Sequence, residues 1–170
     1  MDQLAMRRPN LEGLPEIPSL PPGYTLRARR EGDLEGLAAL LQRAFPETEW
    51  TPARAHAELV TDPDVKQTFV ILFAGQPVAT ASALVPARSP EVGTIHWVGV
   101  DPAHRGQRLG YLISLAVLNE FVRLGCTSAQ LLTDDHRLPA IKTYLKLGFV
   151  PELRGESHGE RWARITALLP

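Results

Sequence analysis

The stretch that decides the fold is TIHWVGVDPAHRGQRLG, residues 94–110. Residues 94–100 are mainly β-branched, aromatic or apolar, which predicts a central strand. A loop that contains Gly106 comes next, and Gly110 lies just after it. From Leu109 to Leu124 apolar residues recur at helical spacing, which predicts a long helix. A strand that passes through a glycine-containing loop directly into a long helix predicts a ligand site at the start of that helix.

The chemistry expected at this helix start is the binding of an anion. The first backbone amides of a helix have no partners inside the helix, and the helix dipole adds partial positive charge there. A phosphate or pyrophosphate fits such a group of amides, and glycine lets the backbone approach it closely. A strand-to-helix connection whose glycines only make the turn is the alternative, because short glycine motifs also occur by chance.

The remaining elements predict a mixed sheet with helices on its faces, an α/β (α+β mixed) fold class. Thr51-Pro52 predicts a capped helix start, and Gly148 predicts a helix end. The predicted strands cover residues 24–30, 68–74, 78–85, 94–100, 129–133, 149–150 and 162–168, and the predicted helices cover residues 33–45, 52–60, 109–124 and 138–147.

The N-terminal residues 1–23 are set apart by composition. They hold five of the fifteen prolines and no apolar periodicity, which predicts an extended arm. The arm could be disordered, or it could pack on the domain or on a partner subunit, so a homodimer is among the candidate assemblies. The predicted domain organisation is this arm followed by one domain over residues 24–170.

The overall composition excludes several classes of function. A hydrophobic fraction of 44% and a net charge of -1, without runs of like charge, indicate a globular protein with no nucleic-acid partner. No secretory signal or stretch of transmembrane length is present, so we expect a cytoplasmic protein with no membrane partner. The single cysteine, Cys126, is expected to be a small buried hydrophobe, and the spacing of the five histidines predicts no metal site.

Two segments together resemble the GNAT acyltransferase family. VGVDPAHRGQRLG is similar to the family's cofactor-binding motif, Arg/Gln-x-x-Gly-x-Gly/Ala, through Arg105 and Gly110. Arg108 departs from the motif by replacing its middle glycine, so its guanidinium could remodel or supplement the phosphate contact. PAIKTYLKLGFVPE resembles the later motif A-x-x-x-Tyr-x-x-x-Gly-Phe, although Arg137 stands where an asparagine is often found.

The resemblance covers residues 24–168 and implies a largely antiparallel twisted sheet of six to seven strands with about four helices. It implies acetyl-CoA as cosubstrate, held in a cleft where two parallel strands splay apart. The pantetheine arm would pair with the backbone of Val98, Gly99 and Val100, and Gly99 is well placed for a bulge that aids the splaying. The pyrophosphate would lie on the amides of Arg105, Gly106, Gln107, Arg108, Leu109 and Gly110.

The resemblance also implies the reaction, an attack of an amine on the thioester. Tyr144 resembles the family's general acid, and a packing role in its helix is the alternative. His96 lies on the strand that often carries the base; it could also be a packed histidine, with water serving as the base. Trp50 and Trp97 could line the acceptor pocket or pack in the core. Asp134 and Asp135 could bind a cationic acceptor or form a solvated turn.

Two other classes of function are alternatives to an acyltransferase. A non-catalytic acyl-CoA-binding or sensory module would fit the substitution at Arg108 and the lack of a carboxylate on the strand. A dinucleotide-binding domain is disfavoured, because G-x-G-x-x-G does not follow a first strand. The leading prediction is an N-acetyltransferase that acts on a primary amine of a small molecule or a protein, with the acceptor unnamed.

Overall fold

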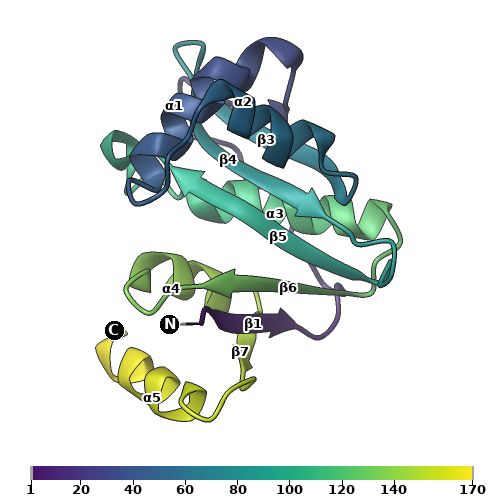
Figure 1. Ribbon diagram of the computed structural model, residues 1–170, viewed down its shortest axis with the longest axis vertical. Helices are drawn as coiled ribbons and strands as arrows, with labels where there is room; N and C mark the ends of the chain where they lie inside the picture. Colours follow the sequence, from purple (N-terminus) through teal and green to yellow (C-terminus); the bar gives the residue numbers. More distant parts are fainter. Residues whose placement is uncertain (1, 170) are drawn as a thin grey trace.

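The computed structural model describes residues 2–169 as a seven-stranded sheet covered by helices on both faces (Figure 1). The strand order is β2-β3-β4-β5-β6-β1-β7, and only the pair β5-β6 is parallel. The mixed, largely antiparallel sheet that the sequence predicted is therefore confirmed. The strands are β1 (Leu4–Arg8), β2 (Tyr24–Ala28), β3 (Val65–Phe73), β4 (Gln76–Leu84), β5 (Val92–Val100), β6 (Ser128–Thr133) and β7 (Val150–Glu152).

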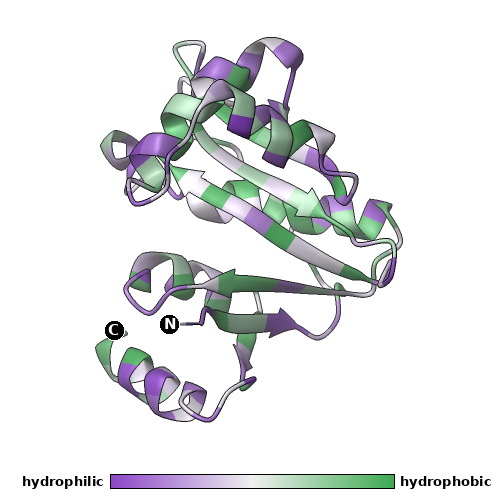
Figure 2. Cartoon of the chain, in the orientation of Figure 1, coloured by the Kyte–Doolittle hydropathy of each residue, from purple (hydrophilic) through white to green (hydrophobic). Residues whose placement is uncertain are grey.

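Five α-helices accompany the sheet, and two hydrophobic clusters show how they pack. One cluster joins α1 and α2 to one face, and the larger cluster joins α3 and α4 to the other. Figure 2 shows hydrophobic residues concentrated on the central strands and α3, with hydrophilic stretches on the outer helices. The helices are α1 (Leu34–Ala44), α2 (Pro52–His56), α3 (Leu109–Arg123), α4 (Leu138–Lys146) and α5 (His158–Leu168), with short turns η1 (Glu31–Asp33), η2 (Ala57–Thr61) and η3 (Pro102–His104).

Local sequence signals fix several helix ends. The Thr51 hydroxyl accepts a hydrogen bond from the Arg54 amide at 3.1 Å, and Pro52 occupies the first helical position, as predicted. Gly148 ends α4 with φ +82°, a conformation that glycine adopts readily. The Phe149 amide then donates to the Tyr144 carbonyl at 3.0 Å, which secures the helix end that carries Tyr144.

The N-terminal segment corrects the predicted arm over residues 1–23. Residues 4–8 form β1, which lies inside the sheet between β6 and β7. Leu4, Ala5 and Met6 are fully buried, because an interior strand has neighbours on both edges and cover on both faces. The folded sheet therefore includes residues before Tyr24, and the described residues of this segment that lie outside strands are Asp2, Gln3 and the stretch from Pro9 to Gly23.

The C-terminal segment corrects a second prediction. Residues 162–168, predicted as a final strand, belong to α5. The buried residues of α5 are His158, Arg161, Trp162 and Ile165, which recur at helical and not at strand spacing. No helix within residues 2–169 is both long and apolar enough to cross a membrane.

Candidate active site

The candidate site is the cleft between β5 and β6. The two strands pair in parallel from Val92 with Ser128 to Ile95 with Leu131, and they diverge after that pair (Figure 1). The cleft-side backbone edge of residues 96–100 is therefore left without a strand partner. A cavity of about 150 Å³ opens there, and its lining is Gln3, Phe45, Thr94, Ile95, His96, Trp97, Val98, Leu132, Thr133, Asp134, Arg137, Ala140 and Tyr144.

A bulge in β5 accompanies the divergence, but its position differs from the prediction. Gly99 pairs with Thr80 and His96 with Ser82, so two residues of β5, Trp97 and Val98, oppose one residue of β4. Trp97 takes the positive φ of 49°, and its ring makes edge contacts with the rings of Phe45 and Trp50.

Gly99 has a different role from the one expected. A Cβ added to it would lie 3.2 Å from the Cβ of Ala44 and 3.3 Å from the ring of Phe45. Gly99 therefore permits α1 to pack closely on β5. The bulge that bends the strand belongs to Trp97, whose strained backbone is held by the surrounding aromatic rings.

The loop from Arg105 to Arg108 is exposed and leads into α3. Gly106 has φ +81° with open space around it, and Arg108 caps the helix with φ 60°. The first backbone bond into the helix runs from the Leu112 amide to the Arg108 carbonyl at 3.1 Å. The amides of Leu109, Gly110 and Tyr111 thus have no partner in the preceding turn, an arrangement that suits an anion.

A cationic hollow lies beside this loop. Its volume is about 260 Å³, and Arg108, Tyr111, Thr143 and Lys146 line it. The guanidinium carbon of Arg108 lies 5.3 Å from the centroid of the Tyr111 ring, a cation–π contact that holds the side chain at the hollow. Two cations beside free helix amides fit a polyphosphate better than a neutral ligand.

Tyr144 reaches the cleft from α4. Its side chain is buried and packs edge-on against Phe149, with ring centroids 6.1 Å apart. Burial raises the pKa of the phenol above its ordinary value, against a smaller opposing effect of Arg137. Because its pKa is raised, the phenol is protonated at neutral pH, and its hydroxyl makes no hydrogen bond to another residue of the described chain.

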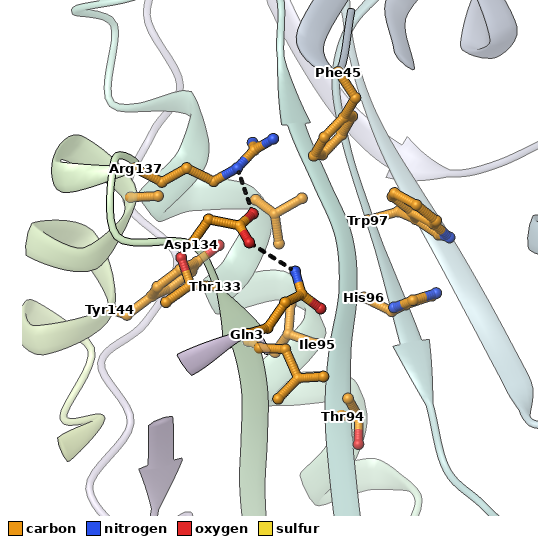
Figure 3. Close-up of a pocket in the computed structure, with 13 residues that line it drawn as sticks. Gln3, Phe45, Thr94, Ile95, His96, Trp97, Thr133, Asp134, Arg137 and Tyr144 are labelled. Carbon is orange, nitrogen blue, oxygen red and sulfur yellow. Dashed lines mark hydrogen bonds and ion pairs between the residues drawn. The ribbon is translucent and has the colours of Figure 1, made fainter. Parts of the chain in front are cut away.

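His96 lies on the cleft edge of β5, on the face of the sheet that α1 and α2 cover, whereas Tyr144 belongs to the opposite face (Figure 3). Burial lowers the pKa of the His96 imidazole, while Glu58 and Asp62 raise it by a smaller amount. The imidazole is consequently neutral at pH 7, the form that accepts a proton.

Three further side chains line the cleft, namely Gln3, Asp134 and Arg137. The Asp134 carboxylate accepts hydrogen bonds from the Gln3 amide at 3.3 Å and from Arg137 Nε at 3.2 Å (Figure 3). Arg137 also pairs with Glu47 at 3.0 Å. The sequence had indicated this position through the acidic pair Asp134-Asp135 and through the departure from the motif at Arg137, whereas nothing in it indicated Gln3, which precedes the buried β1.

Other residues considered from the sequence lie outside the cleft. Asp135 pairs with the buried Arg161 and anchors α5, so its role is structural. The Tyr24 hydroxyl and His104 Nδ1 are 2.8 Å apart, and Cys126 is buried, with a thiol pKa raised by burial. Trp50 packs in the cluster under α1. Among residues 2–169, no three His, Cys, Asp or Glu side chains come together as a metal site.

The comparison with known families agrees with this geometry. The family model "Acetyltransferase (GNAT) family" matches residues 26–149, which include β5, the loop from Arg105 to Arg108 and Tyr144. The chain therefore belongs to the GNAT acetyltransferase family, whose members use acetyl-CoA and an acceptor.

The chain is also similar to individual proteins, two of them mycothiol acetyltransferases and one a solved structure. A mycothiol acetyltransferase of Actinosynnema mirum is 29% identical over 156 residues, which cover 86% of this chain and 51% of the relative. One of Thermobispora bispora is 35% identical over 156 residues, or 85% of this chain and 52% of the relative. A GCN5-related N-acetyltransferase from Sphaerobacter thermophilus shares the fold with TM-score 0.72 and 23% identity, covering 89% of this chain and 48% of that one. The chain thus spans about half the length of these relatives.

Proposed function

We propose that the protein is an acetyl-CoA-dependent N-acetyltransferase that transfers an acetyl group to a primary amine of a small molecule or a protein. The observation that carries this proposal is the end of β5-β6 pairing at Ile95 and Leu131, which opens a cleft next to the free amides of α3. An extended thioester-bearing arm fits the open backbone edge at Val98, Gly99 and Val100. The pyrophosphate fits the amides from Arg105 to Gly110, with Arg108 and Lys146 beside them.

The reaction places two proton transfers on opposite sides of the sheet. The amine nitrogen attacks the thioester carbonyl carbon, the new C–N bond forms, and the C–S bond breaks. His96 takes the proton that the amine loses, since burial keeps the imidazole neutral. Tyr144 gives its proton to the departing sulfur, and both residues then exchange protons with solvent. Their positions on the two faces of the sheet support these separate roles.

The acceptor is expected to enter from the side of α1 and α2. Phe45, Trp97 and His96 line that part of the cleft, and Glu58 accepts a hydrogen bond from the Trp97 indole at 3.2 Å. Aromatic rings with a nearby carboxylate suit a protonated amine on an apolar or sugar-like body. Since its relatives are named mycothiol acetyltransferases, the substrates of those enzymes are the first acceptors to test.

The deciding experiment is transfer of isotope from labelled acetyl-CoA to a library of amines, with release of the CoA thiol measured in parallel. The enzyme is expected to label one class of amine and to release an equal amount of thiol. Saturable acetyl-CoA binding without any transfer would instead support a non-catalytic acyl-CoA-binding module.

A further inference from the structure

Thr133 is a buried side chain whose hydroxyl has no partner. It is the last residue of β6, with 3% of its surface exposed. Within residues 2–169 its Oγ1 makes no hydrogen bond. A buried hydroxyl without a partner destabilises a fold, so its presence needs a reason outside the folded chain itself.

The position of Thr133 relative to the cleft supplies that reason. On one edge β6 pairs with β1, where Thr133 lies opposite Leu4, but on the other edge pairing with β5 ends at Leu131. Thr133 is two residues beyond this last pair, so its side chain lies on the same face of the sheet as Leu131. Leu131 belongs to the cluster that also contains Tyr144. Thr133 and Tyr144 therefore line the cleft on the same face (Figure 3).

The other unpartnered buried atoms provide a comparison. In the described part of the chain they are Trp50 Nε1, Ser114 Oγ and Trp162 Nε1. None of these three residues lines the cleft between β5 and β6. The Thr133 hydroxyl therefore joins the Tyr144 hydroxyl as a group without a partner among residues 2–169 that a ligand in the cleft can reach.

We propose that the Thr133 hydroxyl donates a hydrogen bond to the sulfur of the acyl-CoA thioester, beside the hydroxyl of Tyr144. This inference rests on the proposed acyl-CoA site. When the C–S bond breaks, negative charge develops on sulfur, and a positioned donor stabilises it more than it stabilises the neutral thioester. Thr133 keeps its own proton, and Tyr144 supplies the proton that the sulfur receives. The hydroxyl thus finds its partner only when the substrate is bound.

The test measures the pKa of the CoA thiol bound to the protein, through the ultraviolet absorbance of the thiolate. It needs no acceptor, and the one thiol of the protein, Cys126, is buried and is subtracted with CoA-free protein. We expect the bound thiol to have a lower pKa than free CoA. Thr133→Val should raise it by about one unit, a tenfold change in the thiolate equilibrium, because a hydrogen bond to a charged group is lost. Thr133→Ser should retain most of the wild-type value.

Stability and a matched variant separate this role from packing. Thr133→Val keeps the shape of the side chain and removes an unsatisfied hydroxyl, so the unfolding temperature should stay equal or rise. Ser114→Ala removes a comparable buried hydroxyl from α3 and should leave the thiol pKa unchanged. An equal shift in both variants would mean that the effect is general and would overturn the proposal.

Two further outcomes separate the proposed role of Thr133 from the proposed acyl-CoA site. If Tyr144→Phe raises the pKa of the bound thiol and Thr133→Val does not, the role of Thr133 is wrong and the acyl-CoA site stands. If the wild-type protein binds no CoA by calorimetry, the proposed function itself fails and the Thr133 proposal fails with it.

Discussion

The guanidinium carbon of Arg137 lies 4.4 Å from the centroid of the Phe45 ring, a contact that crosses the cleft between β5 and β6. Phe45 follows α1, which packs on β5, and Arg137 precedes α4, which follows β6. The two halves of the sheet separate after Ile95 and Leu131, where the hydrogen-bonded pairing of β5 with β6 ends. The contact of Arg137 with Phe45 therefore joins the two halves beyond the last strand pair.

We expect the contact to contribute measurably to stability. In a double-mutant cycle of Arg137→Met and Phe45→Leu, the coupling in the free energy of unfolding should be about 1–2 kcal/mol, above the range for an exposed cation–π pair, because Phe45 is buried and the Arg137 side chain is mostly covered. The cycle of Arg137→Met with Glu47→Gln is the control, since Glu47 is more than half exposed and its ion pair should couple less. Chemical denaturation of the wild type and of the five variants that make up the two cycles measures both values, and zero coupling to Phe45 would show that the stacking is incidental.

A charge placed at Gly106 tests the pyrophosphate site. Gly106 has φ +81° and open space for a side chain, so Asp and Asn, which tolerate this backbone region, are a matched pair of nearly equal shape. Gly106→Asp should weaken acetyl-CoA binding at least tenfold more than Gly106→Asn, because only the aspartate repels the phosphates. Calorimetry on both folded variants measures the difference, and equal affinities would move the phosphates away from this loop.

The sequence predicted the central elements of the site because their signals are local. A strand, a positive-φ glycine and a helix start follow one another between Thr94 and Gly110, and Tyr144 lies one helical turn before its C-cap glycine. Each of these features depends on neighbours within a few residues. Such patterns survive in a single sequence without knowledge of the tertiary fold.

The two elements that the sequence did not predict correctly, β1 and α5, depend on contacts between residues far apart in the chain. The partners of β1 are β6 and β7, more than 120 residues away, and burial of Leu4, Ala5 and Met6 together removes the alternation typical of a strand. In α5 the buried Arg161 interrupts the apolar face, and only its pairing with Asp135 and Asp2 explains the burial. Thr133 likewise gains its significance from the strand that fails to pair with it.

Arg108 offers a test of which phosphate the cationic hollow holds. Its φ of 60° suits glycine, so Arg108→Gly restores the family motif without straining the backbone. Dephospho-CoA lacks the 3′-phosphate of CoA, and we expect that phosphate to lie in the hollow that Arg108 and Lys146 line. The variant should therefore bind CoA more weakly than the wild type does, and dephospho-CoA almost as well. Competition binding of the two ligands measures this. Equal losses would assign Arg108 to the pyrophosphate, and no loss would leave it facing solvent.

His96 is tested through the pH dependence of kcat/KM. Burial lowers its pKa, so the acidic limb of the wild-type profile should lie below the ordinary histidine value of about 6.5. His96→Gln should slow the reaction by about a hundredfold and remove that limb. His56→Gln, at an exposed position of α2, is the matched control and should leave the limb in place. A limb that persists in His96→Gln would demote His96 to a packing residue and leave water as the base.

The role of Tyr144 as the general acid is tested by a variant that lacks only its hydroxyl. Burial raises the pKa of the phenol, so it stays protonated throughout the working pH range and can deliver a proton to a thiolate. Its hydroxyl makes no hydrogen bond within the described chain, whereas its ring packs against Phe149. Tyr144→Phe therefore removes the acid and keeps the packing, so the free energy of unfolding and the affinity for acetyl-CoA should change little.

The chemical step should slow by about a hundredfold or more in Tyr144→Phe, measured in single-turnover conditions that exclude slow product release. Tyr24→Phe is the control, because it removes a hydroxyl that bonds to His104 at 2.8 Å outside the cleft. It should cost some stability and leave the chemical step unchanged. If Tyr144→Phe turns over at the wild-type rate, the proton must come from water or from the acceptor, and the buried phenol would be a packing residue of α4.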